Sequence, residues 1–378
     1  MNPQVELIDN KNDVLKFTLG GVNVSIANAI RRTILSDIPI LVFKTSPYEE
    51  NKANISVNTS RLNNEILKQR LSCIPIHFKD IESFPIKDYL LEVNVENNTD
   101  TIMFVTTKDF LIKDITTNKY LSEAKTKEIF PPDDYTGYFI DFVRLRPKLS
   151  EQLPGEKIQL TCEFGIGNAK EDGMFNVVSV CSYGFTPDLD KIDVELAKKK
   201  QFWKDEGKKQ EEIEFESKNW KLLDALRITK KDSFDFILKT IVIYSNNELL
   251  DKSCTIILDK LKKLDDDIET DGVEIKSSEN TLSNSFDVIL ENDDYTIGKS
   301  LEYMLYTKYY EGLKTISFCG YKKMHPHDSE SIIRLAYVDP IDATVIKQNM
   351  KECIVELVKI YEKIQKEFHF LEKSGAKN

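Results

Sequence analysis

Residues 342–371 read DATVIKQNMKECIVELVKIYEKIQKEFHFL, and the spacing of their apolar side chains decides the fold. These side chains recur at steps of three and four residues, which is typical of one face of an α-helix. They are Val345, Ile346, Met350, Cys353, Ile354, Leu357, Val358, Tyr361, Ile364 and Phe368. So wide an apolar stripe needs a second helix to cover it, because uncovered apolar area is unfavourable in water.

The residues before this helix predict a small α+β domain. Strand-like runs occupy 285–290, 315–321 and 331–337, and a helical pattern occupies 296–309. Gly298, in the first turn of that helix, indicates close packing against a neighbouring backbone. We therefore predict a domain over residues 282–378.

An acidic segment precedes this domain. It contains Asp265-Asp266-Asp267, Glu269 and Asp271, followed by small polar residues up to Asn280. Such a segment buries too little apolar area to offset its ordering entropy, so residues 265–281 are predicted to form a mobile linker.

The beginning of the chain repeats the plan of strand, helix, strand and helix. A strand is predicted at 14–19, a helix at 22–37 that Pro39 ends, a strand at 234–242 and a helix at 247–264. We predict that 1–44 plus 226–264 form a first dimerisation-type domain, and that 45–225 form an inserted, mainly-β domain. Short strands are predicted there at 41–44, 89–95, 101–107, 138–145, 158–164 and 174–183.

A charged stretch closes the inserted domain. Residues 194–219 mix Lys198-Lys199-Lys200 with acidic pairs such as Glu211-Glu212, and Trp203 is the one large apolar anchor. Mixed signs favour a solvated helix or excursion over a basic nucleic-acid patch.

The two halves each carry two amphipathic helices without enough local partners. Packing all four together would bury every stripe and give an intramolecular pseudo-dimer of α+β class. Its predicted core is Ile26, Ile30, Ile34, Leu250, Ile257, Leu301, Leu305, Ile354, Leu357 and Tyr361.

Composition limits the function. The 378 residues carry a net charge of −11, which disfavours non-specific binding to a phosphate backbone. Six cysteines without CxxC spacing argue against a disulfide framework or a zinc knuckle. A signal peptide and an apolar run of the roughly 20 residues that a membrane span needs are both missing, so no membrane association is expected.

Three motifs in the first half resemble the alpha-type subunits of cellular RNA polymerases. Val24–Ser36 resembles the family's first-helix signature, with Asn28 and the pair Arg31-Arg32. Asn58–Ile76 is similar to the family's Asn-Thr-Ser, Asn-Glu, Arg-Leu and Ile-Pro segment over nineteen positions. Phe164–Lys170 matches the Gly-x-Gly followed by Ala-Lys.

The second half resembles the family's smaller partner, the eleventh subunit of the nuclear enzyme and its archaeal counterpart. Asp294–Leu301 and Phe318–His327 carry this resemblance. Both halves on one chain resemble the fused subunits of large cytoplasmic DNA viruses, so a giant-virus protein is expected.

The resemblance implies a non-catalytic subunit that scaffolds the two largest polymerase subunits. Further small polymerase subunits are expected partners, and DNA and RNA would be met only through the complex. It also implies a cytoplasmic location, in the viral factory and in the virion, rather than the nucleus. The family's zinc or iron–sulfur site is not expected, because no cysteine lies between His77 and Thr161. No cofactor, metal or catalytic residue is predicted.

The resemblance also implies a set of partner-interface residues: Asn28, Arg31, Arg32, Asn58, Thr59, Glu65 and Arg70. Taken from sequence alone, the arginine pair reads as solvated, and Glu65 with Arg70 reads as a structural salt bridge or cap.

Two other functions remain open. A nucleic-acid-binding transcription factor outside the polymerase core would need a basic stripe with interleaved aromatic residues. A thiol or metallo-hydrolase would use Cys73 or His325. Pro75 prevents a helical pairing of Cys73 with His77, and His325 with His327 lack the third ligand that a metal site needs.

Overall fold

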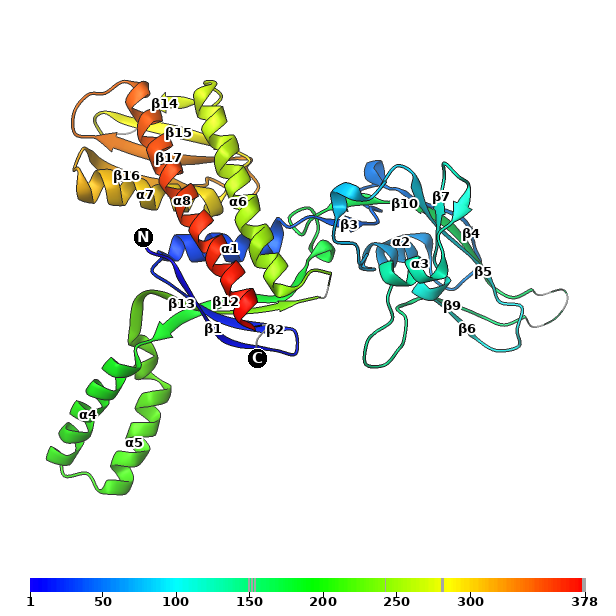
Figure 1. Cartoon of the computed structure of the whole chain (residues 1–378), viewed down its shortest axis with the longest axis horizontal. Helices are drawn as coiled ribbons and strands as arrows, with labels where there is room; N and C mark the ends of the chain where they lie inside the picture. The colour runs from blue at the N-terminus through cyan, green and yellow to red at the C-terminus, as the bar shows by residue number, and fades with distance from the viewer. Residues whose placement is uncertain (149, 151, 153, 242, 280–281, 376–378) are drawn as a thin grey trace. The chain divides into compact units, whose positions relative to one another are not determined.

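A computed structural model describes residues 1–148, 150, 152, 154–241, 243–279 and 282–375, with side chains up to Phe370. The chain divides into two compact units (Figure 1). The larger unit comprises Met1–Ile34, Val180–Lys239 and Asn246–Asn378, and the smaller unit comprises Leu35–Ser179 and Thr240–Ser245. Both predicted dimerisation-type halves therefore contribute to the larger unit.

The larger unit holds two four-stranded sheets. The first has the order β1-β2-β13-β12, with β1 at Gln4–Lys11, β2 at Val14–Gly20, β13 at Thr229–Thr240 and β12 at Val178–Pro187. Asn12 and Asp13 join β1 to β2 with positive φ angles of 52° and 60°, as a tight hairpin turn requires. The second has the order β14-β15-β17-β16, with β14 at Ile275–Ser277, β15 at Ser285–Glu291, β17 at Glu330–Tyr337 and β16 at Ile316–Lys322.

Four helices complete the body of this unit. They are α1 (Val24–Ser36), α6 (Asn246–Glu269), α7 (Tyr295–Leu305) and α8 (Ala343–Gly375). A π-helical turn at Tyr306–Gly312 extends α7. The predicted helices 22–37, 247–264, 296–309 and 342–371 are all found, with ends that differ by a few residues.

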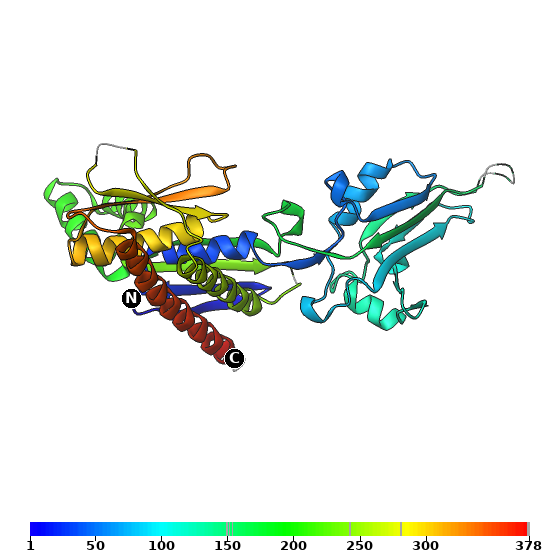
Figure 2. The same cartoon turned by 90° about the horizontal axis from the view of Figure 1, so that it is seen from above.

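Helix α6 packs along α8, and α7 also contacts α8 (Figures 1 and 2). All ten residues of the predicted four-helix core are at most 2% exposed. At the far end of α8, the Phe368 ring meets the Phe17 ring of β2 edge-on, with centroids 5.6 Å apart. Burial of each such Leu, Ile or Phe side chain stabilises the fold by about 1.5–3 kcal/mol. The stripe of the terminal helix is therefore covered within the chain from Ile346 to Phe368, whereas Val345, predicted as part of it, is 41% exposed in the first turn.

Polar contacts fix how α6 and α8 align. Gln365 donates to the Asp251 carboxylate at 2.8 Å and to the Thr255 hydroxyl at 3.1 Å. The hydroxyls of Ser300 on α7 and Tyr361 on α8 lie 3.3 Å apart in the core. Hydrophobic packing alone tolerates sliding, so these directional contacts select one alignment.

The acidic linker predicted at 265–281 is wrong for most of its length. Residues 265–269 continue α6, with Ile268 buried, and 275–277 form the edge strand β14. Lys351 and Lys347 of α8 pair with Glu269 and Asp271. The prediction treated the acidic residues as fully solvated and did not include the lysines of α8 that pair with them. Residues 280–281 lie outside the described part.

The charged stretch, predicted as a solvated helix or excursion, forms a helical hairpin. Helix α4 spans Leu189–Asp205, α5 spans Gln210–Leu222, and Gly207 turns between them with φ of 80°. Trp203 is not the one large apolar anchor, because it packs in a separate small core with Ile192, Leu196, Ile213, Trp220 and Ala225. The hairpin groups with the larger unit, whereas the predicted inserted domain included it.

The smaller unit is mainly β, and its bounds, 35–179 plus 240–245, differ from those predicted for the inserted domain, 45–225. Its five-stranded sheet has the order β4-β10-β5-β7-β8, with bounds Ala53–Asn58, Lys157–Glu163, Tyr89–Glu96, Leu111–Asp114 and Lys119–Tyr120. Two-stranded pairs join β6 (Met103–Thr106) to β9 (Asp141–Leu145), and β3 (Ile40–Val42) to β11 (Gly165–Gly167). Helices α2 (Asn64–Ser72) and α3 (Glu123–Ile129) complete the unit, whose core includes Phe43, Leu67, Phe110, Phe142 and Leu160.

Among the described residues, no helix combines the length and apolar character that crossing a membrane requires.

Gly298 of α7 leaves no room for a side chain. A Cβ atom there would lie 2.0 Å from the Tyr321 ring, so the glycine accommodates an aromatic side chain and not the backbone predicted from sequence. We expect Gly298→Ala to destabilise the protein by about 1–3 kcal/mol through overpacking, measured by urea unfolding. Gly184→Ala is the matched control, because a Cβ there meets nothing within 4 Å. Equal stability of the two variants would contradict the close contact.

Candidate protein-interaction site

Arg32 of α1 binds the start of α7. Its Nη2 donates to Asp294 Oδ2 at 2.8 Å, and its Nε donates to Thr296 Oγ1 at 3.1 Å. Asp294 is the N-cap of α7, because its other carboxylate oxygen accepts from the Thr296 backbone N–H at 2.8 Å. One carboxylate therefore caps a helix and holds an arginine 262 residues away in the sequence.

The electrostatics of Asp294 reflect these bonds. Burial alone would raise its pKa, but the hydrogen bonds from Thr296 and the Arg32 guanidinium outweigh it and hold the pKa at about 2. The carboxylate is thus ionised at neutral pH. The side chains of Arg32 and Asp294 are only 32% and 23% exposed, so solvent screens the pair incompletely.

Arg31 has a different environment from its neighbour. Its Nε and Nη2 both donate to Asn28 Oδ1, at 3.1 and 3.0 Å, one turn earlier on α1. No carboxylate in the described ranges pairs with this half-buried guanidinium. A preoriented arginine without a counter-ion is suited to a carboxylate from another polypeptide.

The segment 58–72 organises a loop and a short helix in the smaller unit. The Asn58 side chain donates to the Leu62 carbonyl and accepts from the Ser60 backbone and hydroxyl. The Thr59 hydroxyl accepts from the Lys157 backbone N–H at 2.7 Å. Asn63 then caps α2 by accepting from the Ile66 N–H. Asn58 and Thr59 thus build the loop that leads into α2.

Arg70 joins α2 to β9. Its Nε donates to the Phe142 carbonyl at 2.7 Å and its Nη2 donates to the Asp141 carbonyl at 2.6 Å. The structural alternative for Glu65 and Arg70 was a salt bridge or cap, but Arg70 binds backbone carbonyls instead. Glu65 is exposed in the first turn of α2.

The residues of the two hydrolase alternatives do not form a catalytic group in the described structure. Cys73 is exposed at the end of α2, while burial lowers the pKa of His77, opposed by Asp134. The His325 and His327 rings lie 5.1 Å apart on an exposed loop. Across the described residues, no cluster of three His, Cys, Asp or Glu could hold a metal ion. Burial raises the pKa of the Cys162, Cys181, Cys319 and Cys353 thiols to about 12, so they are not thiolates at neutral pH.

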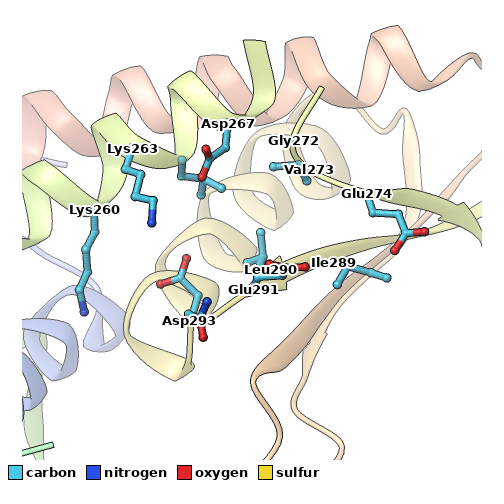
Figure 3. A pocket seen from close by; sticks show the side chains of 12 residues that line it. Lys260, Lys263, Asp267, Gly272, Val273, Glu274, Ile289, Leu290, Glu291 and Asp293 are labelled. Carbon is cyan, nitrogen blue, oxygen red and sulfur yellow. The ribbon is translucent and has the colours of Figure 1, made fainter. Parts of the chain in front are cut away.

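A cavity of about 380 Å³ lies between α6 and the strands β14 and β15 (Figure 3). Lys260, Lys263 and Asp267 of α6 line one side, and Glu274, Glu291 and Asp293 line the other. Carboxylates outnumber the two ammonium groups, which disfavours an anion, and the lining contains no cysteine, serine or histidine. The mixed charges suit contacts between elements of the chain better than catalysis.

The family assignment rests on the first half of the molecule. A model of the RNA polymerase Rpb3/Rpb11 dimerisation domain matches residues 16–261, from β2 into α6. The chain belongs to this family. The match covers α1 with Arg31 and Arg32 and α2 with Arg70, but it ends before β15, α7 and α8.

Similar proteins in this family come from archaea, plants and animals. The DNA-directed RNA polymerase subunit Rpo3 of Pyrococcus furiosus is 33% identical over 97 residues, which are 25% of this chain and 34% of the relative. The DNA-directed RNA polymerases IV and V subunit 3B of Arabidopsis thaliana is 26% identical over 204 residues, covering 50% and 58%. The DNA-directed RNA polymerases I and III subunit RPAC1 of Homo sapiens is 27% identical over 209 residues, covering 50% and 56%. The chain thus spans between about a third and three fifths of these relatives.

The sequence predicts a role for Arg32 but not its bond to Asp294. Asp294-Tyr295-Thr296 enters the sequence analysis only within the motif Asp294–Leu301. The signal was available, because an Asp two residues before a Thr at the start of a helical pattern is typical of an N-cap. A cap carboxylate has a second oxygen that can bind a cation, but the sequence does not say which cation reaches it.

The depressed pKa of Asp294 predicts a pH dependence of stability. A carboxyl with a lower pKa folded than unfolded stabilises the protein above about pH 4, and this contribution is lost as pH falls toward 2. We expect Asp294→Asn to lower the free energy of unfolding by about 2 kcal/mol at pH 6 and by much less near pH 2. Urea unfolding across this pH range measures the difference.

Asp9→Asn is the control for this series, because Asp9 holds only an exposed contact with Lys11 at 3.5 Å. Its effect should stay below about 0.5 kcal/mol at every pH. A pH-independent difference between wild type and Asp294→Asn would contradict the ion pair with Arg32.

Proposed function

We propose that this chain is a non-catalytic assembly subunit of a DNA-directed RNA polymerase, with both dimerisation halves in one polypeptide. The observation that carries the proposal is the packing of α6 from the family-matched half along α8 from the last hundred residues. Two separate subunits of this kind would need such an interface to associate, and here it forms within one larger unit. The second half would then act as the eleventh-subunit-like partner.

The ion pair between α1 and α7 supports this intramolecular pseudo-dimer. Arg32 lies in the first half and Asp294 in the second, and their bond is charge-assisted at 2.8 Å. Bonds of this type contribute about 1.5–3 kcal/mol and are directional. Arg32 therefore has a role inside the chain, and its predicted role at an interface with a separate subunit is a further proposal.

Arg31 is the best candidate for contacting a large polymerase subunit. It is held by Asn28 and has no carboxylate partner in the described part of the chain. We propose that the largest and second-largest subunits contact Asn28, Arg31 and Arg32 of α1, and, as a separate surface on the smaller unit, Asn58 and Thr59 of the loop and Glu65 and Arg70 of α2. Further small subunits would complete the assembly, and DNA and RNA would be met only through it. The platform would need no cofactor or metal of its own.

The proposed setting is a large cytoplasmic DNA virus. Fusion of the two halves motivates this origin, with a cytoplasmic viral factory and the virion as the places where the polymerase would act. An antibody to this chain, applied to purified virions and to infected cells in which the factories are visible, tests it. Absence of the chain from both factory and virion would contradict it.

Co-expression tests the platform role. The chain should co-purify with the two largest polymerase subunits of the same genome, and Arg31→Glu should weaken that complex at least tenfold. The reason is that a carboxylate on the partner would then face a like charge. Size-exclusion chromatography with quantitative mass spectrometry measures the bound fraction.

Arg227→Glu is the matched control for Arg31→Glu. The Arg227 side chain is 84% exposed, and its local ion pair with Asp224 is long at 3.8 Å and therefore weak. Arg32→Glu is unsuitable alone, since it also breaks the bond to Asp294. Full assembly with Arg31→Glu would remove this arginine from the interface. Failure of the wild-type chain to co-purify would overturn the platform role itself.

A further inference from the structure

A groove on the smaller unit combines an apolar floor with a rim of arginines. It has a volume of about 410 Å³, and β9 forms one wall. The loop before α2 and the start of β6 supply the rest. The lining consists of Arg61, Leu62, Arg70, Ile102, Asp141, Phe142, Val143, Arg144, Leu145 and Arg146.

The charge of this rim is unusual for the chain. Four arginines face one aspartate in a protein whose net charge is −11. Only Arg146 has a carboxylate partner in the described structure, Glu156 at 2.6 Å. Arg70 is occupied by two backbone carbonyls, which leave its positive charge uncompensated. Arg144 lies over the Phe104 ring at 4.8 Å, and the exposed Arg61 has no ion pair within the described ranges.

The apolar part of the surface continues beyond the groove. Ile102 is 58% exposed and Phe104 is 47% exposed on β6 and the residue before it. A neighbouring hollow is lined by Phe104, Tyr138 and Phe139, and Tyr138 is 78% exposed. Exposed aromatic side chains beside arginines are the composition enriched in the energetic centres of protein interfaces.

We propose that this groove binds an acidic segment of another protein, with an apolar side chain seated beside Ile102 and carboxylates on Arg61 and Arg144. The guanidinium group binds a carboxylate through two parallel hydrogen bonds, and weak hydration lowers its cost of burial. A hollow of several hundred Å³ accommodates one or two side chains of an extended segment. The groove shares Arg70 and the loop before α2 with the proposed polymerase interface, so this inference rests on the proposed function. Peptide binding by the chain alone and co-purification with the large subunits are separate measurements, so either can fail alone.

Charge complementarity favours a protein segment over nucleic acid. The exposed carboxylate of Asp141 lines both the groove and the neighbouring hollow, and it would repel a phosphate backbone. An acidic peptide of about ten residues can place its carboxylates on the arginines and avoid that carboxylate. A polyphosphate chain has a charge at every step and cannot.

A display experiment on the full-length chain tests the proposal. A library of random twelve-residue peptides is selected against the wild-type protein and counter-selected against Arg61→Glu/Arg144→Glu. Enriched peptides should carry a net charge of about −3 or more negative, with at least one Leu, Ile or aromatic residue. Selection without acidic bias, or selection unaffected by the double variant, would overturn the proposal.

Affinity measurements complete the test. Fluorescence anisotropy of a labelled, enriched peptide should show binding weakened at least tenfold by Arg61→Glu/Arg144→Glu. The neutral variant Arg61→Gln/Arg144→Gln should give a smaller loss of peptide affinity. It controls for a folding defect that charge reversal could cause. Lys119→Glu/Lys125→Glu is the control, because both lysines are exposed in the same unit and neither lines the groove. Its affinity should stay within about twofold of wild type.

A single-stranded oligonucleotide separates the two classes of ligand. A labelled twelve-nucleotide oligothymidylate should bind more weakly than the acidic peptide and should not displace it. Tighter binding of the oligonucleotide, lost in Arg61→Glu/Arg144→Glu, would overturn the proposal in favour of a nucleic-acid groove. Equal weakening of the peptide by the control lysine variant would overturn it in favour of non-specific electrostatics.

Discussion

The apolar stripe of α8 is the constraint on which the larger unit depends. From Ile346 to Phe368 the helix presents a buried face that includes Ile354, Leu357 and Tyr361, and each of these three is at most 2% exposed. No single short element could cover such a length, since a helix advances about 1.5 Å per residue. Helix α6, with 24 residues, is the partner of comparable length, and α7 and β2 cover the remainder. The last hundred residues are therefore tied to residues 1–34 and to residues 246–269.

Directional contacts turn this hydrophobic association into one defined arrangement. The bond from Arg32 to Asp294 links α1 to the N-terminus of α7, and Gln365 links α8 to Asp251 on α6. Each contact joins residues far apart in the chain, so each contributes only when the halves are correctly aligned. The other guanidinium of α1, Arg31, has no carboxylate partner among the described residues and is the charge that we propose for contact with another chain. The proposed platform function follows from this division of roles.

The sequence predicted much of this fold, because long periodic segments are dominated by their own pattern. The helices at 22–37 and 342–371 and the strands at 285–290 and 331–337 were within a few residues of the observed ones. Errors arose where another element decides the outcome. Residues 265–269 continue α6 with Ile268 buried, and Lys351 of α8 pairs with Glu269. The second tryptophan, Trp220, gives residues 189–222 a core of their own. For the site, the sequence indicated Arg32 as an interface residue but not the group that it contacts. Its carboxylate partner lies 262 residues away, and sequence spacing carries no information about such a pairing.

Cleavage between the two halves measures the central claim most directly. A protease site inserted after Glu279 would separate the polypeptide into one piece ending near that residue and a second piece carrying α7 and α8. After complete cleavage at micromolar concentration, the account predicts one particle of unchanged hydrodynamic size in which both pieces co-elute, because α6 still covers α8. Elution of the second piece alone, with its terminal helix exposed to water, would contradict the account.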